Sequence, residues 1–415
     1  MKKKLRIGIL FGGRSGEHEV SLLSAASILK AIDCKKYEVI PIGIDKQGHW
    51  LTGADADRLL GSNPLARPAL PVSPEAAAKA NLEFALAAAV LRSGEPLAIP
   101  PAAAHSPVSL RVGAGAEMAQ PSNPLAASLD VVFPVLHGTF GEDGTIQGLF
   151  ELADIAYVGS GVLGSSAAMD KDAMKRLFAA AGLLQTPYVT LLRSQWRVDS
   201  KRSIKLIEKS LSYPLFVKPA NLGSSVGISK VHNRAELAPA LDLAAGFDRK
   251  IVVEQGVGGA GVKPRELEVS VLGNDAPEAS VVGEIIPNKE FYDYESKYES
   301  SSENPSIPII PAKLSKSEAK QIREMALAAF RACDCSGLAR VDFLMEPSRD
   351  AKGRKIKKPR IYLNEINTMP GFTSISMYPK LWQASGLPYK SLIDRLITLA
   401  LERHREKMET RFTRP

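Results

Sequence analysis

Two stretches near the end of the chain decide the fold: Arg340-Val-Asp-Phe343, and Tyr362-Leu-Asn-Glu-Ile-Asn-Thr-Met-Pro-Gly371. The residues around them predict two short strands, over 338–345 and 361–366, because apolar residues dominate both runs. The charged, turn-forming run 348–360 lies between these strands. The sequence therefore predicts an antiparallel strand pair joined by a basic hairpin.

The polar residues of these strands form a candidate metal site. Side chains at alternate positions of an antiparallel pair share one face, so Asp342 is expected opposite Glu365 and Asn367. The three side chains offer only oxygen ligands, which suit Mg²⁺ better than zinc. Arg340 lies on the same face and places a fixed cation where phosphate charge would develop. Spacing alone leaves a solvated hairpin, with polar residues on its outer face, as the alternative.

Length and composition indicate a globular protein of several domains. A chain of 415 residues is too long for one compact core and predicts about three domains. With 45% hydrophobic and 24% charged residues, it differs clearly from disordered chains. The apolar run 7–11 is too short for a signal peptide or a membrane span. Three cysteines without metal-ligand spacing fit reduced thiols in a cytoplasm.

The basic balance of the chain raises the question of nucleic-acid binding. The formal net charge is +8 and the pI is near 9.2. Basic residues concentrate in 349–360 and after Leu401, where Phe412 is the only aromatic residue. One aromatic residue cannot form a stacking platform, so a solvated surface and no nucleic-acid partner are expected. A basic balance also suits a site that handles phosphates and carboxylates.

The first part of the chain predicts a parallel α/β domain. Strand-like runs over 5–10 and 37–44 flank a helical pattern over 20–30, and an apolar run at 129–136 resumes the order. The intervening residues 52–127 are rich in alanine and proline and indicate a large insert.

The second part of the chain shows no internal repeat and mixes helical and strand-like patterns. Helices are predicted over 166–181, 315–332 and 389–402, and strands over 214–218, 251–254, 267–272 and 281–286.

Two glycine-rich runs in this part differ in what they predict. Lys218 at a strand end precedes Gly223-Ser-Ser-Val-Gly227, a loop whose N–H groups and hydroxyls suit phosphate oxygens, although it lacks the ending of a P-loop. An ordinary surface turn is the alternative. Gly256-Val-Gly-Gly-Ala-Gly261 matches G-x-G-x-x-G, but Pro264 and a strand follow where a helix should begin. A flexible turn is therefore expected there.

Two loops of the first part lie where open α/β sheets bind ligands, at strand ends. Gly12-Gly-Arg-Ser-Gly-Glu17 leads into a helix, where Glu17 is either stabilised by the helix dipole or positioned to bind an ammonium group. His137 begins a second loop rich in glycine, although a lone histidine at a strand end is often structural. The aromatic and charged run 291–298 lies in a long polar region, which predicts a lid or an exposed loop.

With these residues assembled, the chain resembles the D-alanine–D-alanine ligases of the ATP-grasp superfamily. The motifs that carry the resemblance occur in the order typical of the family and cover nearly the whole chain outside the insert. The matching motifs are GGRSGEHEVSLLSA (12–25), HGTFGEDGTIQG (137–148), GSGVLGSSAAMDK (159–171), FVKPANLGSSVG (216–227), EVSVLGN (268–274), FYDYESKY (291–298), ARVDF (339–343) and NEINTMPGFTSISMYP (364–379).

The resemblance implies an α/β protein, α+β in its ATP-binding part, with ATP held between two antiparallel sheets. Three domains are expected: 1–163, 164–253, and 254–415 with a lid loop over 288–306. The implied ATP contacts are Lys171, Lys218, Ser225 and Lys297 for phosphates, Glu254, Gln255 and Val257 for adenine, and Glu266 for ribose. Asp342, Glu365 and Asn367 would hold two Mg²⁺ ions, which Mn²⁺ can replace. Gln255 and Gly256 depart from the lysine and aromatic residue that the family often has there.

The resemblance also implies residues for two D-alanine molecules. Glu17 would bind the first ammonium, with His137 nearby, and Glu17, Ser224 and Tyr298 would close the lid. Ser376 and the Met377 backbone would bind the second carboxylate, and Arg340 with the Gly371 N–H would stabilise the oxyanion.

The implied reaction makes D-alanyl-D-alanine for peptidoglycan precursors in the cytoplasm, through a D-alanyl phosphate and with release of ADP. The implied protein is a homodimer without a membrane partner. Tyr298 marks dipeptide formation in the family, while D-lactate or D-serine as second substrate remains an alternative. A non-catalytic nucleotide-binding regulator is a further alternative, but it would not need Lys218, Arg340 and the metal ligands together.

Overall fold

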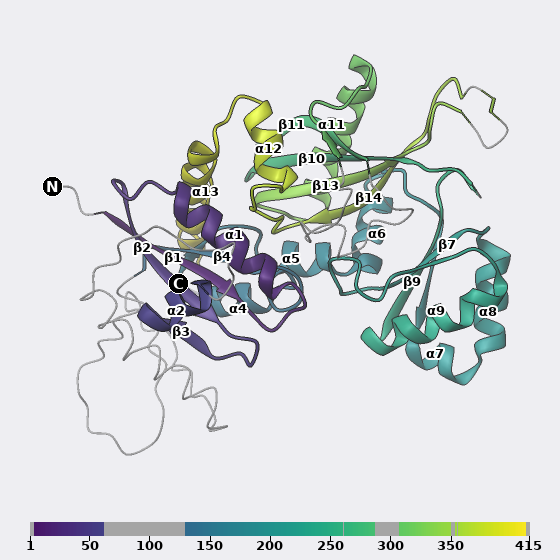
Figure 1. The fold of residues 1–415 in the computed structure, drawn as a ribbon, viewed down its shortest axis with the longest axis horizontal. Coiled ribbons are helices and arrows are strands. Elements are labelled where there is room, and N and C mark those ends of the chain that lie inside the picture. The colour runs from purple at the N-terminus through teal and green to yellow at the C-terminus, as the bar shows by residue number, and fades with distance from the viewer. Residues whose placement is uncertain are drawn as a thin grey trace. The chain divides into compact units, whose positions relative to one another are not determined.

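The computed structural model describes most of the chain and divides it into two compact units (Figure 1). The described residues are 4–61, 129–259, 261–286, 307–349, 353–354 and 356–411. Most of the predicted insert and the predicted lid, with Lys297 and Tyr298, lie outside these ranges. Unit 1 comprises Met1–Gly159, Gly371–Ser376 and Pro388–Pro415, and unit 2 comprises Ser160–Pro370 and Met377–Leu387. The predicted three-domain boundaries stay a prediction.

Unit 1 is built on one mostly parallel sheet, as the sequence predicts. Its strand order is β3-β2-β1-β4-β5, and only the β2–β3 pair is antiparallel. The strands are β1 (Leu5–Gly12), β2 (Tyr37–Ile44), β3 (Trp50–Thr52), β4 (Val131–Val135) and β5 (Ala156–Tyr157). The helices are α1 (His18–Ala31), α2 (Gly53–Gly61), α4 (Thr145–Leu152) and α13 (Tyr389–Met408).

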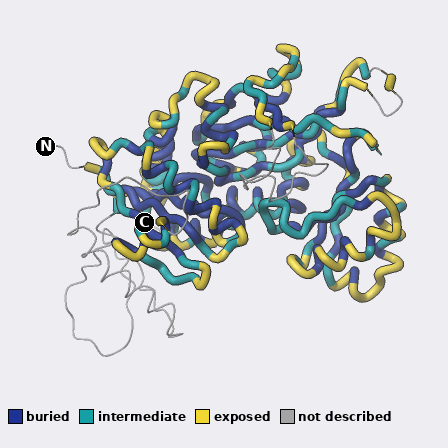
Figure 2. The backbone as a smooth tube through the Cα atoms, in the orientation of Figure 1, coloured by how far each residue is buried: buried dark blue, intermediate teal, exposed yellow. Residues whose placement is uncertain are grey.

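The central strands of unit 1 are buried along nearly their whole length, as Figure 2 shows. Parallel strands covered on both faces require continuous apolar runs, which explains why β1 and β4 lack alternation. β1 ends at Gly12, which has φ +91°. A Cβ there would lie 2.1 Å from the Ile44 carbonyl oxygen, so the chain can leave the sheet at this point only with glycine.

The segment Gly371–Ser376 joins unit 1 through a buried aromatic side chain. Phe372 meets Phe133 edge to face, with ring centroids 5.6 Å apart, and stacks on Tyr389 at 6.3 Å. The Tyr389 hydroxyl donates to the Phe372 carbonyl at 3.2 Å. Six residues distant in sequence from the first sheet are thereby fixed to it.

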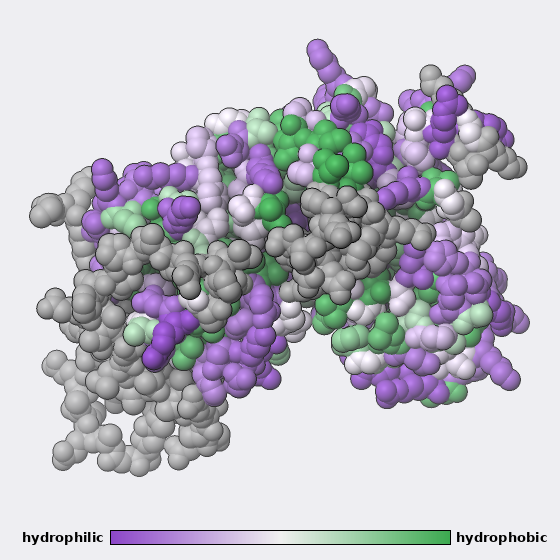
Figure 3. Space-filling view, viewed as in Figure 1, coloured by the Kyte–Doolittle hydropathy of each residue, from purple (hydrophilic) through white to green (hydrophobic). Residues whose placement is uncertain are grey.

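Unit 2 contains two antiparallel sheets. The smaller one has the order β6-β9-β7-β8 and packs its core against three helices. Its strands are β6 (Tyr188–Leu192), β7 (Leu215–Pro219), β8 (Ser229–Val231) and β9 (Lys250–Gln255), and the helices are α7 (Arg193–Val198), α8 (Ser200–Ser210) and α9 (Arg234–Phe247). The outward face of α8 is hydrophilic (Figure 3), because lysine and arginine alternate with its buried positions.

The larger sheet of unit 2 has the order β12-β11-β10-β13-β14. Its strands are β10 (Arg265–Gly273), β11 (Glu278–Ile286), β12 (Ile307–Ile309), β13 (Gly337–Met345) and β14 (Ile361–Asn367). One face packs on α5 (Val162–Met169), α6 (Lys171–Ala180) and α11 (Lys316–Ala332) in a single hydrophobic core, and α12 (Met377–Ala384) contacts β10 and β11. The predicted strand pair β13–β14 is confirmed, with its antiparallel register.

A bulge in β14 preserves the two faces of this sheet. Leu363 and Ile366 both lie in the core although three positions separate them, which a regular strand does not allow. The register shifts between Asp342 and Phe343 of β13, so that Asn364 is the extra residue. Glu365 consequently lies directly opposite Asp342 rather than in the core.

One predicted helix is wrong in its extent. The pattern over 166–181 predicts a single helix, but α5 ends at Met169 and α6 begins at Lys171. Asp170 separates them, and its side chain accepts hydrogen bonds from the backbone N–H groups of Asp172 and Ala173. An N-cap within an apolar periodic pattern therefore starts a new helix. Among the helices that the structure describes, none combines the length and apolar character needed to cross a membrane.

The anchoring of Phe372 can be tested by truncation. Phe372→Ala should lower the free energy of unfolding by about 3–5 kcal/mol, because it removes a fully buried ring and leaves a cavity. Urea unfolding measures this change. Leu152→Ala, at an exposed position of the same unit, is the control and should change stability by less than about 1 kcal/mol. Equal effects of the two variants would show that Phe372 does not anchor its segment.

Candidate active site

Two loops of unit 1 meet where the strand order reverses. β1 has β2 on one side and β4 on the other, and ligands of open α/β sheets bind at such a point. The Ser15 hydroxyl after β1 donates to the His137 carbonyl after β4 at 2.7 Å. A Cβ on Gly138 would lie 2.5 Å from a carboxylate oxygen of Glu17. The predicted residues Glu17 and His137 are therefore neighbours, and both are buried.

A single hydroxyl joins this region to the Gly371–Ser376 segment. The Phe372 N–H donates to Ser24 Oγ at 3.1 Å, and Ser24 Oγ lies 2.9 Å from His137 Nε2. One hydroxyl therefore contacts both this segment and the loop after β4. Ser24 was not predicted, although it lies two helical turns after Glu17 on α1.

The predicted residues Gly371 and Ser376 lie against each other in a tight turn. A Cβ on Gly371 would be 2.7 Å from Ser376 Oγ, so the turn is shaped for glycine. The Thr373 N–H donates to the same hydroxyl at 3.0 Å, and Ser376 N–H donates to the Thr373 carbonyl at 3.1 Å. Met377, the next residue in sequence, starts α12, and its side chain is buried in unit 2.

The polar face of the larger sheet carries the predicted metal ligands. Asp342 lies opposite Glu365 on β14, and Arg340 lies opposite Asn367. Arg340 donates to both oxygens of Asp342 at 2.7 Å, and the Asn367 amide nitrogen donates to Asp342 at 3.1 Å. Glu268 on β10, which was not predicted, lies opposite Asp342 and 3.3 Å from Arg340. Glu268 follows the predicted Glu266 by two residues, and because side chains alternate along a strand, both lie on the same face.

The donor set of this face is two carboxylates and an amide. No group of three His, Cys, Asp or Glu side chains in the described part of the chain is arranged to hold a metal ion. Asp342, Glu365 and Asn367 nevertheless converge across two adjacent strands, and oxygen donors of this kind suit a hard divalent cation.

A cationic region lies at the end of β7 in the smaller sheet. Lys218 is almost fully buried and pairs with Glu254 on β9 at 3.1 Å. After it, Ser224 and Ser225 have φ of 48° and 61°, in the left-handed region that few residues other than glycine adopt. The Lys171 ammonium donates to the Leu222 carbonyl at 2.7 Å, so a second predicted phosphate ligand contacts this loop.

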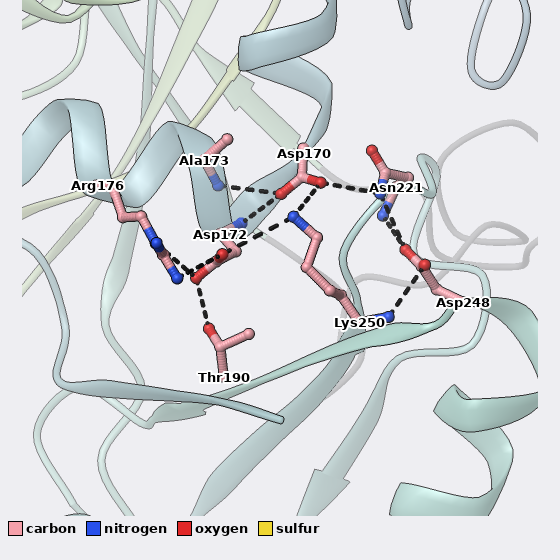
Figure 4. A network of polar contacts seen from close by, with 8 residues as sticks. All are labelled: Asp170, Asp172, Ala173, Arg176, Thr190, Asn221, Asp248 and Lys250. Carbon is pink, nitrogen blue, oxygen red and sulfur yellow. Dashed lines mark hydrogen bonds and ion pairs between the residues drawn. The ribbon is translucent and has the colours of Figure 1, made fainter. Parts of the chain in front are cut away.

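A polar network holds the start of this loop (Figure 4). Asn221 donates through its amide to Asp170 and to Asp248, each at 3.1 Å, and its backbone N–H donates to Asp248 at 2.7 Å. Lys250 pairs with Asp170 at 2.5 Å. The start of α6, the start of β9 and the loop are thus tied together, which fixes Lys171 relative to the loop.

The remaining predicted residues lie on or beside these elements. Gln255 accepts a hydrogen bond from the Ser212 N–H at 2.8 Å, and Val257 is buried in the turn after β9. Glu266 is half-buried on β10. Glu254 directs its carboxylate into unit 2, where Thr186 Oγ1 donates to it at 3.2 Å. Their contacts to adenine and ribose stay predictions.

Comparison with known families decides the assignment. A model described as D-ala D-ala ligase N-terminus matches residues 6–160, and one described as D-ala D-ala ligase C-terminus matches residues 177–398. The chain belongs to the D-alanine–D-alanine ligase family.

Relatives and solved structures of this family match nearly the whole chain. The D-alanine–D-alanine ligase of Natranaerobius thermophilus is 48% identical over 407 residues, which are 98% of this chain and 97% of that protein. The structure of the D-alanine-D-alanine ligase from Coxiella burnetii is 34% identical with a TM-score of 0.69, covering 98% of this chain and 96% of that one. The VanG D-Ala:D-Ser ligase from Enterococcus faecalis is 32% identical with a TM-score of 0.70, covering 96% and 100%. The ATP-grasp fold that the sequence predicts is thereby confirmed.

The role of Ser24 can be tested without any ligand. Ser24→Ala leaves the Phe372 N–H and His137 Nε2 without this partner, which should lower the free energy of unfolding by about 1–3 kcal/mol. The ¹⁵N resonance of His137 Nε2 should shift, because the nitrogen loses this hydrogen-bond partner. Ser27→Ala, on the same helix but bonded to Tyr389 at 3.1 Å, is the matched control and should leave that resonance in place. An unchanged His137 resonance in Ser24→Ala would contradict the assigned contact.

Proposed function

We propose that the chain ligates two D-alanine molecules into D-alanyl-D-alanine, with ATP converted to ADP and phosphate, for peptidoglycan precursor synthesis. The observation that carries this proposal is membership of the ligase family over nearly the full length of the chain. The geometry supports it, because unit 2 combines buried lysines beside a glycine- and serine-rich loop with a carboxylate face on adjacent strands. Phosphoryl transfer needs both features.

ATP would bind in unit 2 between its two antiparallel sheets. Lys171 and Lys218 would contact the phosphates, and the loop containing Ser225 would add N–H and hydroxyl donors. The anchored loop stem supports this role, because a fixed loop loses less freedom when a phosphate binds. Glu254, Gln255 and Val257 would line the adenine pocket, and Glu266 would face the ribose.

Mg²⁺ fits the polar face of the larger sheet. Asp342, Glu365 and Asn367 would hold the ion or ions, and an amide can turn its oxygen toward a cation as readily as it turns its nitrogen toward Asp342. When bound, Mg²⁺ neutralises the negative charge of the transferred phosphate. Arg340 already spans both Asp342 oxygens, so an ion held by Asp342 would share this carboxylate with Arg340.

The amino-acid substrates would be bound by residues from several segments of the chain. Glu17 would hold the ammonium of the first D-alanine, with His137 beside it, and the carboxylate of that molecule would attack the γ-phosphate of ATP. Ser376 and the Met377 N–H would hold the second D-alanine, whose amine would attack the resulting D-alanyl phosphate. Arg340 and the Gly371 N–H would stabilise the oxyanion of that step.

The predicted lid would complete the site. Lys297 would contact the transferred phosphate, and Tyr298 would close with Ser224 and Glu17 over the substrates. Exclusion of water matters here because water would hydrolyse an acyl phosphate.

A different second substrate is the main alternative. The similarity to a structure titled as a D-Ala:D-Ser ligase gives D-serine a specific basis, and D-lactate stays open from the sequence. Acceptor choice is therefore part of the decisive experiment.

That experiment measures ADP release with Mg-ATP and D-alanine, L-alanine, or D-alanine with D-serine or D-lactate, and identifies products by mass. D-alanyl-D-alanine from D-alanine alone is the expected result. If a mixed product predominates, the second substrate is D-serine or D-lactate rather than D-alanine. If ADP release does not depend on any of these amino acids, the protein only binds or hydrolyses ATP and is not a ligase.

Arg340→Ala should leave ATP binding largely intact but lower turnover by about 100-fold or more, because a cation is lost from the reacting centre. Steady-state kinetics and ATP titration measure the two quantities separately. Arg349→Ala, at an exposed position, is the control for loss of an arginine. Near-normal turnover of Arg340→Ala would remove this residue from the proposed mechanism.

Glu365→Gln should raise the Mg²⁺ concentration needed for half-maximal activity, because it replaces a charged ligand with a neutral one. Direct binding of Mn²⁺, followed by electron paramagnetic resonance, should weaken in parallel and does not depend on turnover. Glu278→Gln, at an exposed position of the same sheet, serves as the control. Identical Mn²⁺ binding by Glu365→Gln and the unaltered protein would place the metal elsewhere.

A further inference from the structure

Lys175 is a buried cation for which the proposed reaction gives no role. It lies on α6, one helical turn after Lys171, and its side chain is completely inaccessible to solvent. Burial of an ammonium group is unfavourable unless other charges or dipoles compensate it. A buried lysine in a ligand-binding unit therefore requires an explanation.

The surroundings of Lys175 compensate its charge only in part. Its ammonium lies 3.4 Å from one carboxylate oxygen of Glu254 and 5.3 Å from the centre of the Tyr188 ring. Among the described residues it has no hydrogen-bond partner. Burial lowers the pKa of Lys175, against the attraction of Glu254, and Lys218 adds to this lowering. Glu365 on β14 contributes a weaker attraction.

Glu254 is shared between two lysines. Its other oxygen lies 3.1 Å from Lys218, and Thr186 Oγ1 donates to the carboxylate at 3.2 Å. Burial alone would raise the pKa of Glu254, but Lys175 and Lys218 outweigh it and lower the pKa to about 2. Glu254 therefore stays ionised, and Lys175 and Lys218 share its one carboxylate.

The position of Lys218 gives this sharing of Glu254 a consequence. Lys218 ends β7, directly before the loop containing Ser224 and Ser225, whereas Lys175 lies deeper in unit 2. A carboxylate paired with Lys218 alone would neutralise it and hold it away from a bound anion. A carboxylate drawn also toward Lys175 leaves positive charge on the Lys218 side of the cluster.

We propose that Lys175 is a positioning residue that shares Glu254 with Lys218 and so keeps the charge of Lys218 available to the phosphates of ATP. This inference rests on the proposed function, because it takes Lys218 as a phosphate ligand. Lys175 itself does not touch the nucleotide. Its effect is on the affinity for ATP rather than on the later reaction of D-alanine.

The direct test is calorimetric titration of Mg-ATP into the full chain without D-alanine. Lys175→Met should raise the Kd for ATP by about 10- to 100-fold, the range for loss of one charged interaction. The KM for D-alanine and the turnover at saturating ATP should change little. Thr186→Val is the matched control, since it removes a neutral contact to the same carboxylate without changing the charge of the cluster.

Two double variants separate charge sharing from a merely structural role. In Lys175→Met/Glu254→Gln the carboxylate that would hold Lys218 is also gone, so the affinity for Mg-triphosphate, which makes no contact in the adenine pocket, should recover toward that of the unaltered protein. In Lys175→Met/Lys218→Met the Kd should equal that of Lys218→Met alone, because Lys175 acts through Lys218.

Several outcomes would overturn the inference. A Lys175→Met protein with lower thermal stability but unchanged ATP affinity would show a structural role only. Additive effects with Lys218→Met, or no recovery with Glu254→Gln, would exclude action through the shared carboxylate. If Lys175→Met does not fold, Lys175→Gln and the charge-balanced double variant provide the same comparison. If the unaltered chain does not bind Mg-ATP, the proposed function fails instead.

Discussion

The separation of apolar and charged side chains onto opposite faces of β10, β13 and β14 is the constraint on which unit 2 depends. One face of β13 places Val341 and Phe343 in the core, and the other carries Arg340 and Asp342. A shift of one position would bury both charges, so the register is fixed by burial alone. The bulge at Asn364 follows from the same constraint. The strand accommodates an extra residue so that its apolar side chains stay in the core.

Elements governed by local pattern could be predicted from the sequence. β13 alternates core and polar residues from Ala339 to Phe343, and α11 begins with a capping box between Ser315 and Glu318, so their positions follow from period and capping. The break at Asp170 could not be read from periodicity, because small and apolar residues continue on both sides of it. There the side-chain cap, rather than the hydrophobic pattern, decides where the helix ends.

Contacts between distant segments account for most of what the sequence did not reveal about the candidate site. Ser24 meets Phe372, which follows it by 348 residues, and nothing local to either residue indicates the other. Lys175 on α6 and Glu254 on β9 lie 79 residues apart in sequence and meet only in the folded unit. The only local clue to Lys175 was its spacing from Lys171, which places both on one side of a helix. Such a pattern alone cannot distinguish a buried partner from a solvated one.

The two proposed ligand sites of unit 2 share a physical arrangement. Each important cation already has a carboxylate partner in the protein: Lys218 has Glu254, and Arg340 has Asp342. A ligand must therefore compete with an existing ion pair, and its affinity depends on how strongly that pair holds. In both places a third charged side chain makes the existing ion pair easier for a ligand to displace. Lys175 draws Glu254 away from Lys218, and Glu268 offers Arg340 a second carboxylate beside Asp342. The carboxylate partners can thus compensate these buried charges before any ligand arrives and still leave them available to one.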